Sequence, residues 1–258
     1  MQINGRTIGE GQPPYIIAEL SCNHNGSLDK AKLMIAMAAA AGADAVKLQT
    51  YKPEDLTNDP ELTKLYQKAM TPREWHAELF GHAKRRGITI FSSAFSVEAV
   101  KFLEELGTPA HKLASMEIKR CDLRDAMLAT GKPVLISTGM ATEPQLRRVF
   151  GEPDVALMHC VAQYPSKIED ANLMAIKYLG IENIVGLSDH TPGYETAIAA
   201  TALGACIIEK HFKLDDDCID AAYSLDPAQF AAMCKAVRAI YKGMGDGVIR
   251  PTCEPRKR

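Results

Sequence analysis

The sequence predicts an α/β fold in which eight parallel strands close into a barrel surrounded by helices, the (β/α)8 or TIM-barrel architecture. Short apolar segments rich in β-branched residues recur at fairly even intervals, and the 258-residue chain contains eight of them. A helical pattern follows each segment, and this alternation favours parallel strands joined by helices. No GxGxxG sequence follows the first strand, so a closed barrel is favoured over an open, doubly wound sheet.

The predicted strands are dominated by apolar residues, as expected for strands that are covered on both faces. In chain order they occupy residues 15–21, 45–51, 89–95, 110–115, 133–139, 155–161, 184–190 and 206–212. Helices are predicted at residues 28–41, 72–86, 97–106, 121–130, 142–149, 169–179, 194–203 and 227–242. Gly42, Gly87 and Gly107 end the first three helices, and Asp226-Pro227 opens the last.

Length and composition point to one globular domain. Apolar residues make up 47% of the chain and charged residues 24%, which leaves ample material for a core. We predict one barrel domain over residues 1–245 and a C-terminal tail or linker over 246–258. The formal charge of -2 argues against nucleic-acid binding. The lack of a long apolar segment and of a signal-peptide pattern predicts a cytoplasmic protein without membrane contact.

Polar residues stand at the C-terminal end of every predicted strand, the edge where a TIM barrel builds its active site. A ring of such residues favours an active site over unrelated capping groups, and we expect the whole set to converge on one mouth. In chain order the set is Glu19, Ser21, Asn23, His24, Lys47, Gln49, Ser92, Ser93, Lys112, Ser115, Glu117, Ser137, Thr138, His159, Tyr164, Ser188, Asp189, His190, Glu209, Lys210 and His211.

His190 and His211 end consecutive predicted strands, so their imidazoles can approach each other. Neutral imidazole is a common ligand of divalent metals, and two histidines with open coordination positions suit a catalytic metal that accepts substrate oxygens. Two ordinary hydrogen-bonded histidines would give the same spacing. The pattern leaves both interpretations open.

Lys47 and Lys112 lie inside apolar strands, where an unpaired ammonium is costly. Each lysine either pairs with a carboxylate of the rim or binds an anion. Serine hydroxyls nearby would suit the oxygens of a phosphorylated acid, and these belong to Ser93, Ser115, Ser137 and Ser188. A Schiff-base lysine is a competing role. Glu19 is either the ion-pair partner of a lysine or a base or orienting group for a hydroxyl or water.

Several segments carry a family resemblance. In order and spacing the chain is similar to the sialic acid (N-acetylneuraminate) synthase family, which condenses phosphoenolpyruvate with an N-acylated amino sugar to give a nine-carbon ulosonic acid. The resemblance rests on IIAELSCNHNGSLDKA, GADAVKLQTY, HKLASMEI, ISTGMAT, HCVAQYPSKIEDANL, VGLSDHTPG and GACIIEKHF. AELSCNHNGSL, TPREWHAELF and YPSKIEDANL look most like the pseudaminic acid synthase branch.

The resemblance implies roles for residues already singled out. His190 and His211 would hold a Mn²⁺- or Mg²⁺-type ion that polarises the sugar aldehyde. Phosphoenolpyruvate would be bound by Lys47, Ser93, Lys112, Ser115, Ser137 and Ser188. Glu19 would orient or deprotonate a hydroxyl or a water molecule, and Glu117 is a further catalytic candidate. The amino sugar would face Gln49, Tyr164 and Asp220.

The chain also departs from the family. Ala162 stands where Asn or Ser is usual, and the loop that leads to Asp220 is shorter. Family members continue into a small antifreeze-like domain that reaches the neighbouring subunit's sugar site, whereas this sequence ends at PTCEPRKR. We therefore expect a barrel-only member or a site closed by a separate antifreeze-like chain, and, by resemblance, a homodimer.

Two alternatives stay open at this point. One is a related 3-deoxy-ulosonate synthase or an aldolase that acts on a different aldehyde. The other is a non-catalytic barrel that needs a separate partner domain. The intact set Glu19, Lys47, Lys112, His190 and His211 argues against the second alternative.

Overall fold

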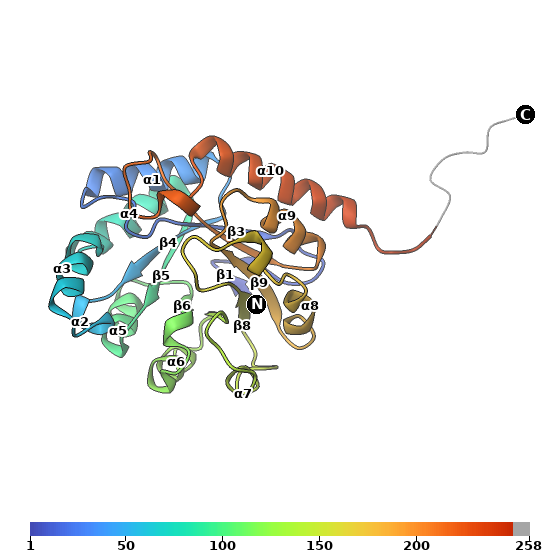
Figure 1. The fold of residues 1–258 in the computed structure, drawn as a ribbon, viewed down its shortest axis with the longest axis horizontal. Helices are drawn as coiled ribbons and strands as arrows, with labels where there is room; N and C mark the ends of the chain where they lie inside the picture. The colour runs from blue at the N-terminus through green and yellow to red at the C-terminus, as the bar shows by residue number, and fades with distance from the viewer. Residues whose placement is uncertain (250–258) are drawn as a thin grey trace, which may run out of the picture.

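The computed structural model describes residues 1–249 and shows a closed barrel of eight parallel strands inside a ring of helices (Figure 1). The barrel strands are β3 (Tyr15–Glu19), β4 (Ala45–Thr50), β5 (Thr89–Ala94), β6 (His111–Leu113), β7 (Val134–Ser137), β8 (Val155–His159), β9 (Ile184–Asp189) and β10 (Ile207–His211). Each strand pairs in parallel with the next, and β10 pairs with β3 to close the barrel. The predicted fold class is confirmed.

Helices connect the strands and cover the outside of the barrel. The α-helices are α1 (Leu28–Ala40), α2 (Pro53–Leu56), α3 (Pro60–Ala69), α4 (His76–Arg86), α5 (Val97–Glu105), α6 (Cys121–Leu128), α7 (Glu143–Leu146), α8 (Ala175–Leu179), α9 (Glu195–Ala202) and α10 (Pro227–Met244). Short 3-10 turns are η1 (Arg73–Trp75), η2 (Ser115–Glu117), η3 (Ile168–Asp170) and η4 (Ala221–Tyr223). No helix within residues 1–249 is long and apolar enough to cross a membrane.

The apolar core forms two layers, because successive strand residues point alternately into the barrel and out toward the helices. The inner layer includes Ile17, Leu135 and Ile207, and the outer layer packs the strands against the helices. A short antiparallel pair, β1 (Gln2–Ile3) and β2 (Arg6–Thr7), adds Ile3 and the following Ile8 to the inner layer. This packing fills the N-terminal end of the barrel, so polar side chains gather at the C-terminal end.

The helices differ from the prediction at several places, and one of them is α2, which was not predicted. The helix predicted at 169–179 is divided into η3 and α8, because Asn172 adopts a left-handed conformation with φ 41° that a helix cannot continue through. The helix predicted at 142–149 is reduced to α7. The prediction missed α3, although Asp59 caps it and Pro60 occupies its first turn, both of which are helix-start signals.

Candidate active site

The inward-pointing polar residues of the strand ends line one cavity of about 410 Å³. Strand register explains the grouping: Glu19 lies beside Lys47, Ser93 beside Lys112, and Ser188 beside Glu209 on neighbouring strands. Most of the residues predicted for the site line this cavity, and they are Glu19, Lys47, Gln49, Ser93, Lys112, Ser115, Ser137, Tyr164, Ser188, His190, His211 and Asp220. The structure therefore brings together residues from all eight barrel strands and their loops.

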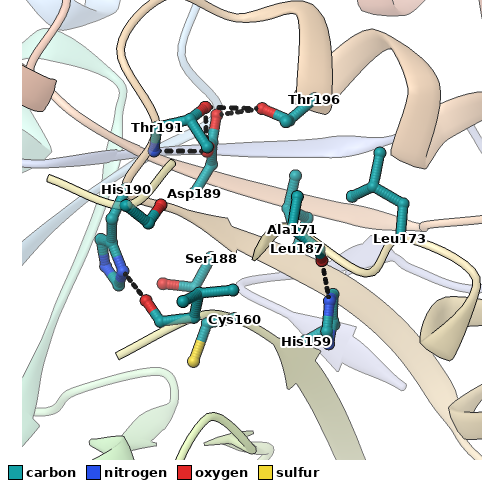
Figure 2. Close-up of a pocket in the computed structure, with 12 residues that line it drawn as sticks. His159, Cys160, Ala171, Leu173, Leu187, Ser188, Asp189, His190, Thr191 and Thr196 are labelled. Atoms are coloured by element: carbon teal, nitrogen blue, oxygen red, sulfur yellow. Dashed lines mark hydrogen bonds between the residues drawn. The ribbon is translucent and has the colours of Figure 1, made fainter. Parts of the chain in front are cut away.

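The predicted rim is wrong for the residues that point outward. Lys210 is fully buried between the barrel and the helices, where its Nζ lies 2.9 Å from Asp189 Oδ2. Figure 2 shows the Asp189 carboxylate hydrogen-bonded to Thr191 and Thr196. Ser92 and His159 also have outward parity: Ser92 bonds to Thr50, and His159 bonds to the Ala171 carbonyl. The alternation of side chains along a strand excludes them from the mouth.

The structure also separates Glu117, Thr138, Asn23 and His24 from the cavity wall. β6 ends at Leu113, and η2 carries the Glu117 carboxylate to within 3.6 Å of the Arg120 guanidinium. Burial raises the pKa of the Glu117 carboxyl.

Asn23 and His24 instead fix the loop that follows β3. The Asn23 amide donates to the Phe212 carbonyl. His24 Nδ1 accepts from the Gly26 N–H, and its Nε2 bonds to the Thr71 hydroxyl. Because this arrangement requires a neutral ring in a buried position, the pKa of His24 is lowered to about 4, with burial as the main cause.

Lys112 is a buried ammonium without an ion-pair partner among residues 1–249. Its side chain is 3% exposed, and Nζ donates to the Ser137 hydroxyl and, at 3.2 Å, to the Leu113 carbonyl. Burial lowers its pKa, because Glu209 and Glu19 lie too far from the ammonium for an ion pair and offset the loss of water only in part. Of the two possibilities that the sequence left open, a carboxylate partner or a bound anion, Lys112 fits the second.

Lys47 fits the first possibility. Its ammonium forms an ion pair with Glu19, lies 3.7 Å from Glu209 Oε1, and donates to Ser93 Oγ at 2.9 Å. Burial disfavours the charged form, but Glu19 and Glu209 outweigh it and raise the pKa of Lys47. Glu19 in turn accepts bonds from the Ser21 N–H and the Gln49 amide, both at 3.1 Å. Burial raises the pKa of Glu19 against the effect of Lys47.

Glu209 was placed on the rim by the sequence without a role, yet it lies between the two lysines. Ser188 Oγ donates to its Oε1 at 2.9 Å, whereas Oε2 has no hydrogen-bond partner in the described part of the chain. Burial would raise its pKa, but Lys47 and Lys112 outweigh burial and lower it to about 2. A buried, ionised carboxylate with one free oxygen can accept a hydrogen bond from a donor group of a ligand. Glu209 stands two residues before His211 on the same strand, so both side chains point into the barrel. This spacing was the signal that could have singled out Glu209.

Ser115, the second serine of the predicted set, is held by the loops that follow two neighbouring strands, β7 and β8. Ser115 Oγ accepts the Gly139 N–H at 3.1 Å and lies 3.0 Å from Cys160 Sγ. A Cβ at Gly139 would lie 2.8 Å from that sulfur, so only glycine fits between the loops that follow β7 and β8. Ala162 lines the cavity close by and adds no side-chain donor.

The outer part of the cavity wall is apolar. Leu56 of α2, together with Leu65 and Tyr66 of α3, forms one side, and Met116 and Met140 lie in the loops that follow β6 and β7. Met116 is 53% exposed and Met140 52% exposed. The cavity thus combines a charged floor with an apolar mouth.

His190 and His211 meet with ring centroids 5.4 Å apart. His190 Nδ1 bonds to the Val161 carbonyl at 2.9 Å, and His211 Nδ1 bonds to Asp220 Oδ2 at 3.0 Å. Neither Nε2 has a hydrogen-bond partner within residues 1–249. Burial, followed by His211, lowers the pKa of His190 to about 4, so its imidazole is neutral at neutral pH.

These two imidazoles fit a divalent metal. Metal-binding histidines usually donate their second ring N–H to a carbonyl or carboxylate, which sets the tautomer and aims the other nitrogen. Among the described residues no group of three or more His, Cys, Asp or Glu side chains is arranged to hold a metal ion. The protein would therefore provide two imidazole ligands, and water or substrate oxygens would complete the coordination.

Tyr164 and Tyr223 enclose the two imidazoles. The Tyr164 ring lies 4.3 Å from His190 and 5.5 Å from Tyr223 between centroids, and Tyr223 lies 4.8 Å from His211. The Tyr223 hydroxyl donates to Asp220 Oδ1. Tyr223 was not among the predicted site residues, because its contact depends on the path of a loop that no strand or helix periodicity describes.

A closed parallel barrel whose C-terminal mouth joins a buried lysine–serine group to two imidazole Nε2 atoms without hydrogen-bond partners in the described residues defines an enzyme of the TIM-barrel class. The chain belongs to the NeuB family, whose model matches residues 34–249. The resemblance derived from the sequence motifs is confirmed.

Individual relatives agree with this assignment. A pseudaminic acid synthase of Helicobacter pylori is 44% identical over 91% of this chain and 76% of its own length. An N,N'-diacetyllegionaminic acid synthase of Campylobacter jejuni is 35% identical over 94% of this chain and 80% of its own length. The crystal structure of an N-acetylneuraminic acid (sialic acid) synthetase from Leptospira borgpetersenii matches with a TM-score of 0.93 at 32% identity, covering 98% of this chain and 92% of that one. The prediction that the chain is an enzyme is confirmed by these synthases.

Proposed function

We propose that this protein condenses phosphoenolpyruvate with the open-chain aldehyde of an N-acylated amino sugar, giving a nonulosonic acid and inorganic phosphate. The observation that carries the proposal is Lys112, a buried ammonium without a carboxylate partner in the described part of the chain. An anion is the ligand that would compensate this charge. Serine hydroxyls surround the same position, and a phosphate and a carboxylate on one small molecule would use them together.

The anion site is built by Lys112 with its serine neighbours. Ser137 contacts the ammonium directly, and Ser115 lies on the same cavity wall with its oxygen held by the Gly139 N–H. Ser188 is bonded to Glu209, and Ser93 to Lys47. In this proposal these groups bind the phosphate and carboxylate of phosphoenolpyruvate, so that its enol carbon faces the imidazole pair.

The reaction forms one carbon–carbon bond and one carbon–oxygen bond, and it breaks one carbon–oxygen bond. The enol C3 attacks the aldehyde carbon, whose oxygen takes up a proton to become a hydroxyl, and C2 becomes an oxocarbenium centre. A water molecule then adds to C2 and gives up one proton. The tetrahedral intermediate then loses phosphate through cleavage of the C2–O bond. The site's cations stabilise negative charge on the phosphate throughout. Glu19, whose pKa is raised by burial, would orient this water and take its proton.

A divalent ion of the Mn²⁺ or Mg²⁺ type at His190 and His211 would supply a Lewis acid for the aldehyde oxygen. The protein's own contribution at this point is orientation. The Val161 carbonyl and the Asp220 carboxylate bond the Nδ1 atoms, and both Nε2 atoms are left for coordination.

The apolar mouth favours a sugar with apolar substituents. Leu56, Leu65 and Tyr66 would contact acyl methyl groups or a deoxy carbon, while the Gln49 amide donates to Glu19 at the charged floor. We therefore propose a 2,4-diacetamido-trideoxyhexose, and hence a pseudaminic-type product, over N-acetylmannosamine. The similarity to the pseudaminic acid synthase of Helicobacter pylori supports the same choice.

We also propose that residues 1–245 act as one catalytic domain whose mouth a second polypeptide covers, either a partner copy in a homodimer or an antifreeze-like domain. Exposed apolar side chains around the mouth support this proposal, and they include Leu65, Met140 and Ile219. A monomer in light scattering, active without any added chain, would contradict it. The cytoplasmic location stays a prediction.

The test is phosphate release from phosphoenolpyruvate by EDTA-treated protein, with and without Mn²⁺, against N-acetylmannosamine and 2,4-diacetamido-trideoxyhexoses. Release that requires both metal and sugar is expected. Release without sugar would indicate a phosphatase, and a borohydride-trapped adduct on Lys47 or Lys112 would indicate the Schiff-base alternative.

A further inference from the structure

The Asp220 carboxylate is held at both of its oxygens. Oδ2 lies 3.0 Å from His211 Nδ1, and Oδ1 accepts the hydroxyl proton of Tyr223. The backbone of Asp220 is fixed as well, since its N–H donates to Asn23 Oδ1 and its carbonyl accepts from Ser224 Oγ. Asp220 is 5% exposed and Tyr223 8% exposed, so neither group exchanges its partner for bulk water at no cost.

Local structure explains why these two side chains meet. The single turn of η4 places residue 223 three positions after Asp220, and residues three apart on a helical turn lie on the same side. The Tyr223 ring then packs against His211 and Tyr164, which fixes the direction of its hydroxyl. The contact is therefore built by backbone and ring packing together.

We propose that the Tyr223 hydroxyl is a positioning group for the metal-binding histidine His211, acting through Asp220. This inference rests on the metal site of the proposed function. With Tyr223 as donor, one carboxylate oxygen is occupied and the other accepts the His211 Nδ1–H, so that His211 Nε2 points into the cavity. Asp220 then orients the imidazole through Oδ2 while Tyr223 holds Oδ1, a role that the family resemblance did not assign to it.

The hydroxyl matters because a carboxylate is an acceptor with two equivalent oxygens. Without the Tyr223 donor, Oδ1 is left in the cavity wall and competes for other donors or for the metal, and the carboxylate is free to rotate away from His211. Partners of a metal-binding histidine commonly contribute 10–100-fold to metal affinity, and a group one step further out is expected to contribute roughly 3–10-fold.

The experiment measures Mn²⁺ affinity of the EDTA-treated full chain by calorimetry and by the EPR signal of free Mn²⁺. Tyr223→Phe removes one oxygen and keeps the ring, so it is expected to weaken Mn²⁺ binding roughly 3–10-fold. Asp220→Asn is expected to weaken it by roughly 10-fold or more. Tyr164→Phe is the matched control: its ring also packs on the imidazoles, but its hydroxyl has no hydrogen-bond partner among residues 1–249, so Mn²⁺ affinity should not change.

A positioning role also predicts what stays constant. The KM of Tyr223→Phe for phosphoenolpyruvate should match that of the unmodified chain, because Lys112 and its serines are untouched. Loss of one buried hydrogen bond should lower the metal-free melting temperature by only roughly 2–4 °C. A merely structural role would lower the melting temperature and leave Mn²⁺ affinity unchanged, and that result would overturn the proposal. So would Mn²⁺ affinity equal to that of Tyr164→Phe, or a normal affinity for Asp220→Asn.

The outcomes separate this inference from the proposed function. If the unmodified chain binds no Mn²⁺, the metal site and the positioning role both fail. If Mn²⁺ binds and Tyr223→Phe weakens it, the positioning role stands, even where no sugar triggers phosphate release and the proposed condensation is refuted.

Discussion

Replacing Lys112 with methionine should separate ligand binding from folding. Met keeps the length of the side chain and removes the charge. In the free protein the buried ammonium has two hydrogen bonds and no carboxylate partner in the described part of the chain. Its desolvation cost and the loss of these bonds are both a few kcal/mol and opposite in sign, so we expect Lys112→Met to be as stable as the unmodified protein within about 1–2 kcal/mol.

Binding of phosphoenolpyruvate should change much more. Loss of charge-assisted bonds to an anion costs at least about 3 kcal/mol, or roughly 100-fold in Kd. Ligand at 100 times the Kd of the unmodified protein stabilises it by about 2.7 kcal/mol, which for a chain of this size is a rise in Tm of roughly 5–10 °C. The same concentration should raise the Tm of Lys112→Met by no more than about 1–2 °C.

The assay is thermal unfolding with and without phosphoenolpyruvate, with Lys101→Met as the control because Lys101 is an exposed lysine of α5. The reasoning is refuted if Lys112→Met is strongly destabilised without ligand and still gains several degrees from phosphoenolpyruvate. That result would mean that Lys112 supports the barrel and that the anion binds elsewhere.

Three further perturbations test the structure. Lys210→Met leaves Asp189 buried without its cation and should lower the free energy of unfolding by about 3–5 kcal/mol, measured by urea denaturation. Gly139→Ala places a methyl group 2.9 Å from the Cys160 carbonyl oxygen and should lower the free energy of unfolding by about 1–3 kcal/mol. It should also raise the KM for phosphoenolpyruvate, because it displaces the Gly139 N–H that holds Ser115. Burial lowers the pKa of His24 from 6.5 to about 4, so the unfolded chain binds more protons between these values. The His24 contribution to stability should fall by up to about 3 kcal/mol as pH drops from 6.5 to 4. His24→Gln should reduce the acid sensitivity without removing it, because His190 has a similarly lowered pKa.

Each of these changes has a control and an opposing result. Gly243→Ala lies in α10 with open space around the added Cβ and should not lower the Tm, whereas an unchanged Tm for Gly139→Ala would contradict the packing argument. For Lys210→Met, the double variant with Asp189→Leu should recover part of the lost stability, since both charges are gone. If His24→Gln and the unmodified protein lose stability in parallel between pH 6.5 and 4, another group accounts for the acid sensitivity.

Local patterns in the sequence determined the barrel. Each of the eight strands is a buried apolar segment, and the chain returns after each one through a helical pattern, so the alternation alone defines the fold class. The period of two along a strand also determined which rim residues share the cavity. Glu209 and His211 have inward parity, and Lys210 between them does not, so the parity was readable although the prediction treated all three alike.

Other features depended on contacts between distant segments. Whether Lys47 or Lys112 had a carboxylate partner followed from the barrel register, which sets Lys47 beside Glu19 and leaves Lys112 beside Ser93. The Glu117 carboxylate is the kind of group that can act in catalysis. The short strand β6 and the turn η2, however, place it outside the cavity.

The link from Tyr223 through Asp220 to His211 was decided by tertiary structure alone. It joins a strand end to a loop turn whose path no periodic pattern describes. The sequence by itself determined the barrel and most of the groups at its mouth, because strand and helix periods are local. The tertiary structure decided which of those groups are paired and which are free, because pairing depends on distances between strands and loops that are far apart in the chain.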